Sequence, residues 1–135
     1  PAMDTLTSFV LGSFFQRFPN IRVAIVEMGC TWVPYFLHSL DHAGGLLDRR
    51  VEAFGHRLTE KPSDVFKQNV WISPFPEEDV VGLANLIGAS QVLMGSDWPH
   101  PEGNHYPAEY TECLEGLSEG DIRLIMRDNA LGLVS

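Results

Sequence analysis

Hydrophobic positions along this 135-residue chain follow first a helical period and then an extended one. Apolar residues recur at three- and four-residue spacing over residues 5–17, which predicts an amphipathic helix capped by Asp4 or Thr5 and ended by Pro19. The stretch "RVAIV", residues 22–26, is apolar at consecutive positions. This pattern predicts a strand covered on both faces, as in a parallel sheet.

Helical and extended segments continue to alternate along the rest of the chain. A helix is expected over residues 31–41, broken by "HAGG", with a further helical piece over residues 46–56. The same criteria predict helices over residues 62–68, 77–87 and 108–115, the second of which ends at Gly88. A last helix begins at Ser118, with Asp121 in a capping box. Strands are predicted over residues 70–73 and 91–95. Strands that alternate with helices indicate an α/β fold with a parallel sheet.

Composition narrows the classes of protein and partner. The sequence has 44% hydrophobic and 20% charged residues, as expected for one globular domain. Its formal charge of −9 disfavours nucleic acid as a binding partner, because the phosphate backbone is also negative. We found no apolar run of the roughly 20 residues that span a membrane and no signal-peptide pattern. Cys30 and Cys113 lack a metal-type spacing, so we expect reduced thiols in a cytoplasmic protein.

Polar side chains follow each predicted strand. Glu27 follows the first strand, Ser73 ends the second, and "GSDWPH", which contains Asp97 and His100, follows the third. The carboxyl ends of parallel strands open onto one face, where ligands bind. We therefore expect Glu27, Ser73 and Asp97 to share a pocket at the edge of a sheet with strand order 1-2-3.

Each of these residues also has a simpler interpretation. Asp97 is equally typical of an Asx turn that closes a strand, and Glu27 of a glutamate near a helix N-terminus. Trp71 and Trp98 suit a core or a pocket wall. Three histidines fit surface positions: His38 and His42 are four apart without the glutamate of a zinc-protease motif, and His56 has polar neighbours. His105 lies in the long loop after the third strand, from which it could reach a substrate, and its role stays open.

Four motifs in this order resemble one known family: "RVAIVEMGCTWVPYFLHSLD", "NVWISPFPEEDV", "GSDWPHPEG" and "RDNALGL". They are similar to the C-terminal half of the amidohydrolase-related, metal-dependent hydrolases, which include the aminocarboxymuconate-semialdehyde decarboxylase-like enzymes. The resemblance implies a (β/α)8 TIM barrel, of which residues 1–135 would form the C-terminal portion with about three parallel strands and flanking helices. It also implies a divalent metal, usually zinc, at the carboxyl ends of the strands.

The resemblance assigns roles to the residues at the strand ends. Asp97, after the eighth barrel strand, is the implied metal ligand or proton acceptor, and Glu27, after the sixth, a base or substrate contact. The remaining implied substrate contacts are Ser73, Trp71, Trp98 and His100. The implied function is a metal-dependent hydrolase acting on a small carboxylated or cyclic substrate. The alternatives are a non-oxidative decarboxylase of the same fold, and a catalytically silent fragment or pseudo-enzyme that needs a partner chain.

Two departures from the family pattern bear on these roles. Members often carry a histidine where Glu27 stands, and the paired His-x-His ligands and mid-barrel histidine have no counterpart here. A barrel of this type takes about 250 residues, so we expect the N-terminal strands to be absent. The chain alone should then hold an incomplete metal site, be inactive and expose apolar surface through which it associates, for example as a homo-oligomer. The hypothesis of a nucleotide-binding protein with an open sheet is weaker, since the sequence contains no glycine-rich phosphate loop.

Overall fold

The computed structural model describes residues 2–49, 58–101 and 103–134. Two compact units are formed by segments that alternate along the chain. The first comprises Pro1–Ile21 and Val33–Asn69, and the second Arg22–Trp32 and Val70–Ser135. The organisation as one domain stays a prediction.

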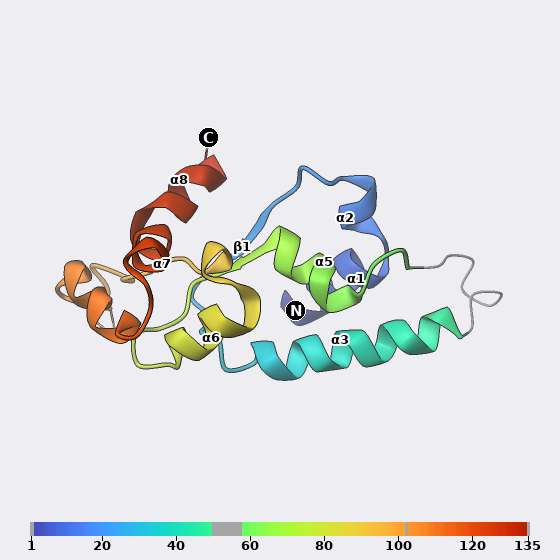
Figure 1. Cartoon of the computed structure of the whole chain (residues 1–135), viewed down its shortest axis with the longest axis horizontal. Coiled ribbons are helices and arrows are strands. Elements are labelled where there is room, and N and C mark those ends of the chain that lie inside the picture. Colours follow the sequence, from blue (N-terminus) through green and yellow to red (C-terminus); the bar gives the residue numbers. More distant parts are fainter. Residues whose placement is uncertain (1, 50–57, 102, 135) are drawn as a thin grey trace. The chain divides into compact units, whose positions relative to one another are not determined.

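The first unit is helical (Figure 1). Its helices are α1 (Ala2–Leu11), α2 (Phe14–Arg17), α3 (Val33–Asp48) and α5 (Pro62–Asn69). The single helix expected over residues 5–17 is wrong, because the chain breaks at Ser13, whose backbone is left-handed with φ 59°.

The break expected at "HAGG" is also wrong, because α3 continues through Gly44 and Gly45. A Cβ atom on the buried Gly44 would lie 2.5 Å from Cγ of Pro62, so glycine lets α3 approach α5 closely. Glycine inside a helix costs about 1 kcal/mol against alanine, and here this close packing offsets the cost. The rest of the predicted helical piece, from residue 50 onward, and His56 lie outside the described residues.

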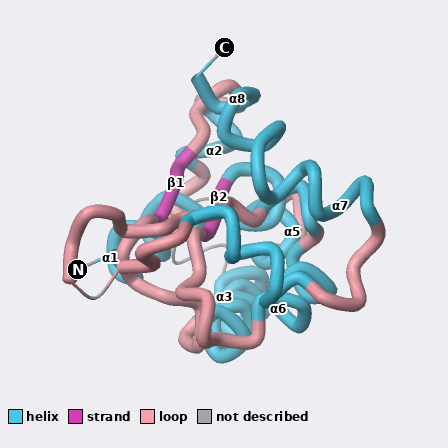
Figure 2. The backbone as a smooth tube through the Cα atoms, turned by 90° about the vertical axis from the view of Figure 1, so that its left-hand side faces the viewer, coloured by secondary structure: helices cyan, strands magenta, loops and turns pink. Residues whose placement is uncertain are grey.

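A parallel pair of strands organises the second unit (Figure 2). Strand β1 (Val23–Ile25) pairs with β2 (Val70–Ile72), and Ile72 forms an isolated parallel bridge to Val92. The order of the three segments is as predicted, but the third strand is reduced to this bridge, because a 3₁₀-helix (Ala89–Gln91) takes up its first residue. The backbone still connects at the carboxyl edge, where Leu93 N donates to Ile72 O at 2.8 Å.

The two faces of this sheet differ in burial. Val70 and Ile72 point to one face and are 0% exposed, whereas Ala24, on the opposite face of β1, is exposed. The expectation that β1 is covered on both faces is therefore wrong for the described part of the chain. Its consecutive apolar residues leave one face open.

Helices after β2 complete the second unit. Helix α6 (Val80–Ile87) begins three residues later than predicted, because Asp79 caps it by accepting from Gly82 N, and it ends at Gly88 as expected. A 3₁₀-helix (Pro107–Leu114), α7 (Glu119–Arg123), a π-helical turn (Leu124–Asp128) and α8 (Asn129–Val134) follow. The predicted capping of α7 is confirmed, since Ser118 Oγ accepts from Asp121 N at 3.1 Å. Over the described ranges, no helix is both long and apolar enough to cross a membrane.

Asn129 joins the C-terminal helices to the third strand segment. Its Nδ2 donates to the carbonyls of Ala89 and Val92 at 2.8 and 2.7 Å, and the residue is 8% exposed. We expect Asn129→Ala to lower the free energy of unfolding by about 2–3 kcal/mol, since it removes the donor from two carbonyls of a buried segment. Urea denaturation of the full-length protein measures this, with the exposed Asn85→Ala in α6 as a control expected within about 0.5 kcal/mol. Equal effects of the two changes would contradict a role for Asn129 in joining these segments.

Candidate functional site

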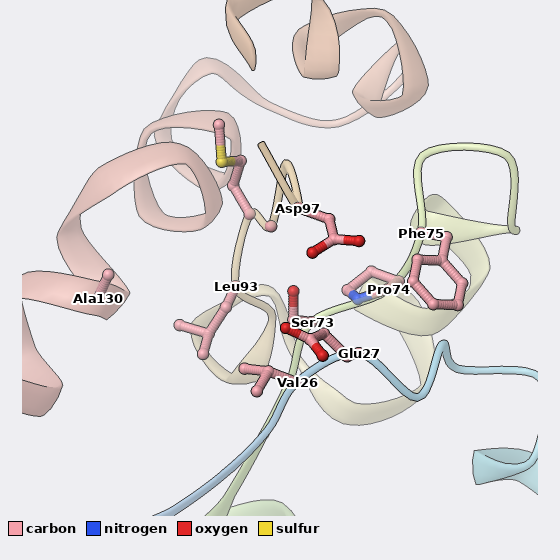
Figure 3. A pocket seen from close by; sticks show the side chains of 10 residues that line it. Val26, Glu27, Ser73, Pro74, Phe75, Leu93, Asp97 and Ala130 are labelled. Carbon is pink, nitrogen blue, oxygen red and sulfur yellow. The ribbon is translucent and has the colours of Figure 1, made fainter. Parts of the chain in front are cut away.

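The three strand ends meet at one pocket, as predicted. A cavity of about 190 Å³ is lined by Glu27 after β1, Ser73 after β2 and Asp97 after the third segment. Apolar residues form most of the remaining wall: Val26, Pro74, Phe75, Leu93, Met94, Gly95 and Ala130. Figure 3 shows the oxygen atoms of Asp97 and Ser73 directed into the same space. The volume is several times the roughly 30 Å³ of one liquid water, so part of a small molecule fits.

Both carboxylate residues of the pocket have an uncommon backbone conformation. Glu27 has φ 58° and Asp97 has φ 52°, in the left-handed region. This region costs a residue with a side chain about 1–2 kcal/mol, and such strain gathers at functional sites. Of the three described non-glycine residues with a positive φ, Ser13 lies elsewhere and the other two are the carboxylates that line the pocket, which favours a functional role for both.

The side chain of Asp97 contacts a histidine. Nδ1 of His100 lies 2.9 Å from Oδ1 of Asp97, and the histidine side chain is 59% exposed. A carboxylate only accepts, so Nδ1 carries the proton, and Nε2 of a neutral ring is left as an acceptor. The turn that an Asx residue would close is supported instead by Ser96, whose Oγ accepts from Trp98 N at 3.3 Å.

Ser73 lies against a glycine of the third segment. It is 7% exposed, and a Cβ atom on Gly95 would lie 2.1 Å from its Oγ. Glycine at this position lets the hydroxyl approach the neighbouring strand end. The buried Tyr110 adds a second restraint, because its hydroxyl donates to Pro74 O at 2.9 Å and burial raises the pKa of the phenol.

A second cavity of about 250 Å³ adjoins the first and shares Phe75, Gly95 and Asp97 with it. Its other lining residues are Pro76, Glu77, Ser96, Gly103 and Asn104. Asp97 therefore contributes to two hollows, and a ligand at its carboxylate can extend into either.

Several predicted contacts lie outside these cavities. Trp71 lines neither of them; its Nε1 donates to Ser90 O at 2.8 Å, which ties β2 to the start of the third segment. The role of Trp71 as a pocket wall in the whole protein stays a prediction. Trp98 is 64% exposed in the loop after Asp97 and also lines neither cavity. His38 and His42 on α3, and His105, are exposed.

Sequence reasoning missed Glu78, which the pattern placed inside a helix. Its carboxylate accepts backbone hydrogen bonds from Cys30, Thr31 and Phe75, in the loops after β1 and β2. Glu78, rather than Glu27, therefore accepts hydrogen bonds from the N–H groups that precede α3. The usable signal was Asp79, a strong N-cap residue that places Glu78 before the helix.

No group of three or more His, Cys, Asp or Glu side chains suitable for a metal occurs in the ranges that the structure covers. The donors near the pocket are carboxylate oxygens of Asp97 and Glu27, which suit a divalent ion but make up part of a ligand set. The remaining ligands of such an ion would have to come from elsewhere in the protein.

The amidohydrolase family matches residues 1–134, so the chain belongs to this family. The chain is 38% identical to an amidohydrolase from Mycobacterium avium subsp. paratuberculosis K-10 of known structure, with a TM-score of 0.87 over 98% of this chain and 33% of that one. It also shares its fold with 5-carboxyvanillate decarboxylase from Sphingomonas paucimobilis, at a TM-score of 0.70 and 22% identity, over 94% of this chain and 37% of that one. The predicted membership is confirmed.

Curated relatives are decarboxylases. The chain is 26% identical over 128 residues to 2-amino-3-carboxymuconate-6-semialdehyde decarboxylase from Dictyostelium discoideum, covering 93% of this chain and 34% of the relative. It is 26% identical over 122 residues to gamma-resorcylate decarboxylase from Rhodococcus jostii (strain RHA1), covering 88% and 35%. The chain thus spans about a third of the length of the curated relatives it matches.

Proposed function

We propose that the protein containing this chain is a metal-dependent, non-oxidative decarboxylase that removes a carboxyl group from a small aromatic or unsaturated acid. The observation that carries the proposal is the pocket with two strained carboxylates and apolar walls. The decarboxylases among the relatives support this chemistry more closely than the hydrolase that the family resemblance first implied. The chain would form the C-terminal part of a (β/α)8 barrel, with Asp97 at its last strand end.

Charge in the pocket supports a bound divalent cation. Glu27 and Asp97 both line it, and its described lining contains no lysine or arginine. A carboxylated substrate would meet two like charges there, which is unfavourable in a site walled by apolar residues. Asp97 would be one ligand of the ion, whose positive charge would offset these carboxylates.

The residues of this chain then have distinct parts in the reaction. The bond between the substrate carbon and its carboxyl group breaks, CO₂ leaves, and a proton is added to the carbon that keeps the electron pair. Glu27 would take up that proton from solvent on its carboxylate and transfer it to the carbon. Asp97 orients the ring of His100, whose Nε2 accepts a hydrogen bond from a substrate hydroxyl group, and Trp98 covers the substrate from the same loop.

Incubation of the full-length protein with γ-resorcylate, 5-carboxyvanillate and 2-amino-3-carboxymuconate-6-semialdehyde tests the proposal. We expect CO₂ release from at least one acid, loss of that activity on chelation, and recovery when one equivalent of a divalent ion is restored. Esters, lactones and amides form the comparison set.

Hydrolysis is the second candidate, favoured by the amidohydrolase that is 38% identical. Turnover of an ester, lactone or amide without CO₂ release from any acid would replace the decarboxylase by this hydrolase. A full-length protein that binds no divalent ion and turns over neither set would indicate a pseudo-enzyme.

A further inference from the structure

One carboxylate connects the loops that follow the two strands. Glu78 accepts from Cys30 N with both oxygens, at 2.8 and 2.9 Å, and from Thr31 N with Oε1 at 3.2 Å. On the other side, its Oε2 accepts from Phe75 N at 2.8 Å. Backbone donors from both loops therefore converge on one side chain.

The loop after β1 is shaped to admit this carboxylate. Gly29 is buried, has φ +61°, and a Cβ atom added to it would lie 2.6 Å from Oε1 of Glu78. Glycine is therefore required twice, for the backbone conformation and for the close approach. The carbonyl of Gly29 also accepts from Nε1 of Trp32 at 3.1 Å, which restrains the same loop.

The two connected loops carry pocket residues. Glu27 lies two residues before Gly29, and Ser73 two residues before Phe75, which itself lines the pocket. We propose that Glu78 is a positioning residue, which fixes the loop after β1 to the loop after β2 and so holds Glu27 and Ser73 in place around the pocket. The kinetic part of this inference rests on the proposed function; the connection between the loops does not.

Glu78→Gln weakens the connection with little change of shape. An amide keeps one acceptor oxygen: at the Oε1 position it loses the bond from Phe75 N, and at the Oε2 position it loses the bond from Thr31 N. In either orientation its NH₂ group faces backbone N–H donors, which is unfavourable. Glu78→Asp keeps the charge but is shorter by one methylene. Asp79→Asn is the matched control, because it makes the same carboxylate-to-amide change in the next residue, whose bond is to Gly82 N at the start of α6.

The thiol of Cys30 reports on the loop independently of activity. Cys30 is 5% exposed, and burial, with a contribution from the Glu78 carboxylate, raises its pKa to about 12. At pH 8 it should therefore react slowly with iodoacetamide, since the thiolate is the nucleophile. Peptide mass spectrometry of the full-length protein separates its labelling from that of Cys113, which serves as the internal reference.

We expect Glu78→Gln to accelerate labelling of Cys30 at least about 10-fold relative to Cys113, and to accelerate amide exchange in the peptides that contain Cys30 and Phe75. Asp79→Asn should leave the labelling within about twofold. The kcat of the decarboxylase should fall about 10–100-fold in Glu78→Gln with a smaller change in KM, because the pocket groups are misplaced. Glu78→Asp should lie between wild type and Glu78→Gln in every readout.

Three outcomes separate the inference from the proposed function. Unchanged labelling and exchange in Glu78→Gln would overturn the connection between the loops. Accelerated labelling with an unchanged kcat would overturn the positioning role. If the wild-type protein decarboxylates none of the acids, the proposed function fails, and labelling with exchange in both loop peptides still decides whether Glu78 holds the loops together.

Discussion

Asp97→Asn in the full-length protein is expected to lower kcat by about 10³-fold while the fold is retained. The change removes one negative charge from the carboxylate that lines both cavities and lies 2.9 Å from His100 Nδ1. Asparagine has nearly the same shape and is among the residues that best tolerate the left-handed backbone found here, φ 52°. Stability should therefore change by less than about 1 kcal/mol. Steady-state kinetics and urea denaturation measure the two effects.

Asp128→Asn is the matched control for this variant. The Asp128 carboxylate forms two ion pairs, with Nε of Arg123 and with a terminal guanidinium nitrogen of Arg127, each at 3.0 Å. Asp128 lines neither cavity. Exposed ion pairs contribute about 0–1 kcal/mol, so this change should leave kcat unaltered. Wild-type turnover in Asp97→Asn would show that Asp97 takes no part in the reaction and only shapes the turn after the strand.

Gly103→Ala is expected to lower kcat about 100-fold by moving Asp97 without changing any side chain of the pocket carboxylates. A Cβ atom on Gly103 would lie 2.5 Å from the carbonyl oxygen and 2.7 Å from the carbonyl carbon of Asp97, and 2.8 Å from Ser96 O. These neighbours are backbone atoms, so they cannot rotate away as a side chain would. The loop also closes on itself through Asn104 N, which donates to Ser96 O at 2.7 Å. We expect a loss of about 1–3 kcal/mol in the free energy of unfolding.

Gly45→Ala provides the comparison for this substitution. Gly45 lies within α3, and no atom approaches within 4 Å of the position its Cβ would take. Alanine there should stabilise the protein by up to about 1 kcal/mol and leave kcat unchanged. Full activity of Gly103→Ala would show that the loop adapts without displacing Asp97.

Local pattern was sufficient to predict the order of the elements and the residues at the strand ends. The apolar run before Glu27 and the one before Ser73 form β1 and β2, and proline and glycine mark ends that the structure retains, such as Gly88. Side-chain periodicity and turn chemistry act between residues close in the chain, so these features can be obtained from sequence.

Other features depend on contacts between segments far apart in the chain. The pattern predicts a helix break at Gly44, but α3 continues through it, and Gly44 packs closely against Pro62. Trp71 points to Ser90 rather than to the pocket, and no periodicity specifies that partner. Glu78 accepts from Cys30 and Thr31, which lie 48 and 47 positions away in the chain, so the pattern around Glu78 carries no sign of them.

The alternation of helices with strand segments, and the positions of Glu27, Ser73 and Asp97 after those strands, follow from the sequence alone, because hydrophobic period is a local property. The other features arise from tertiary contacts. These contacts placed Glu27 and Asp97 in left-handed conformations, reduced the third strand to the bridge at Val92, and brought Glu78 between two loops. Each of these outcomes depends on contacts between segments distant in sequence, whose free energy exceeds the local preference of the residues involved.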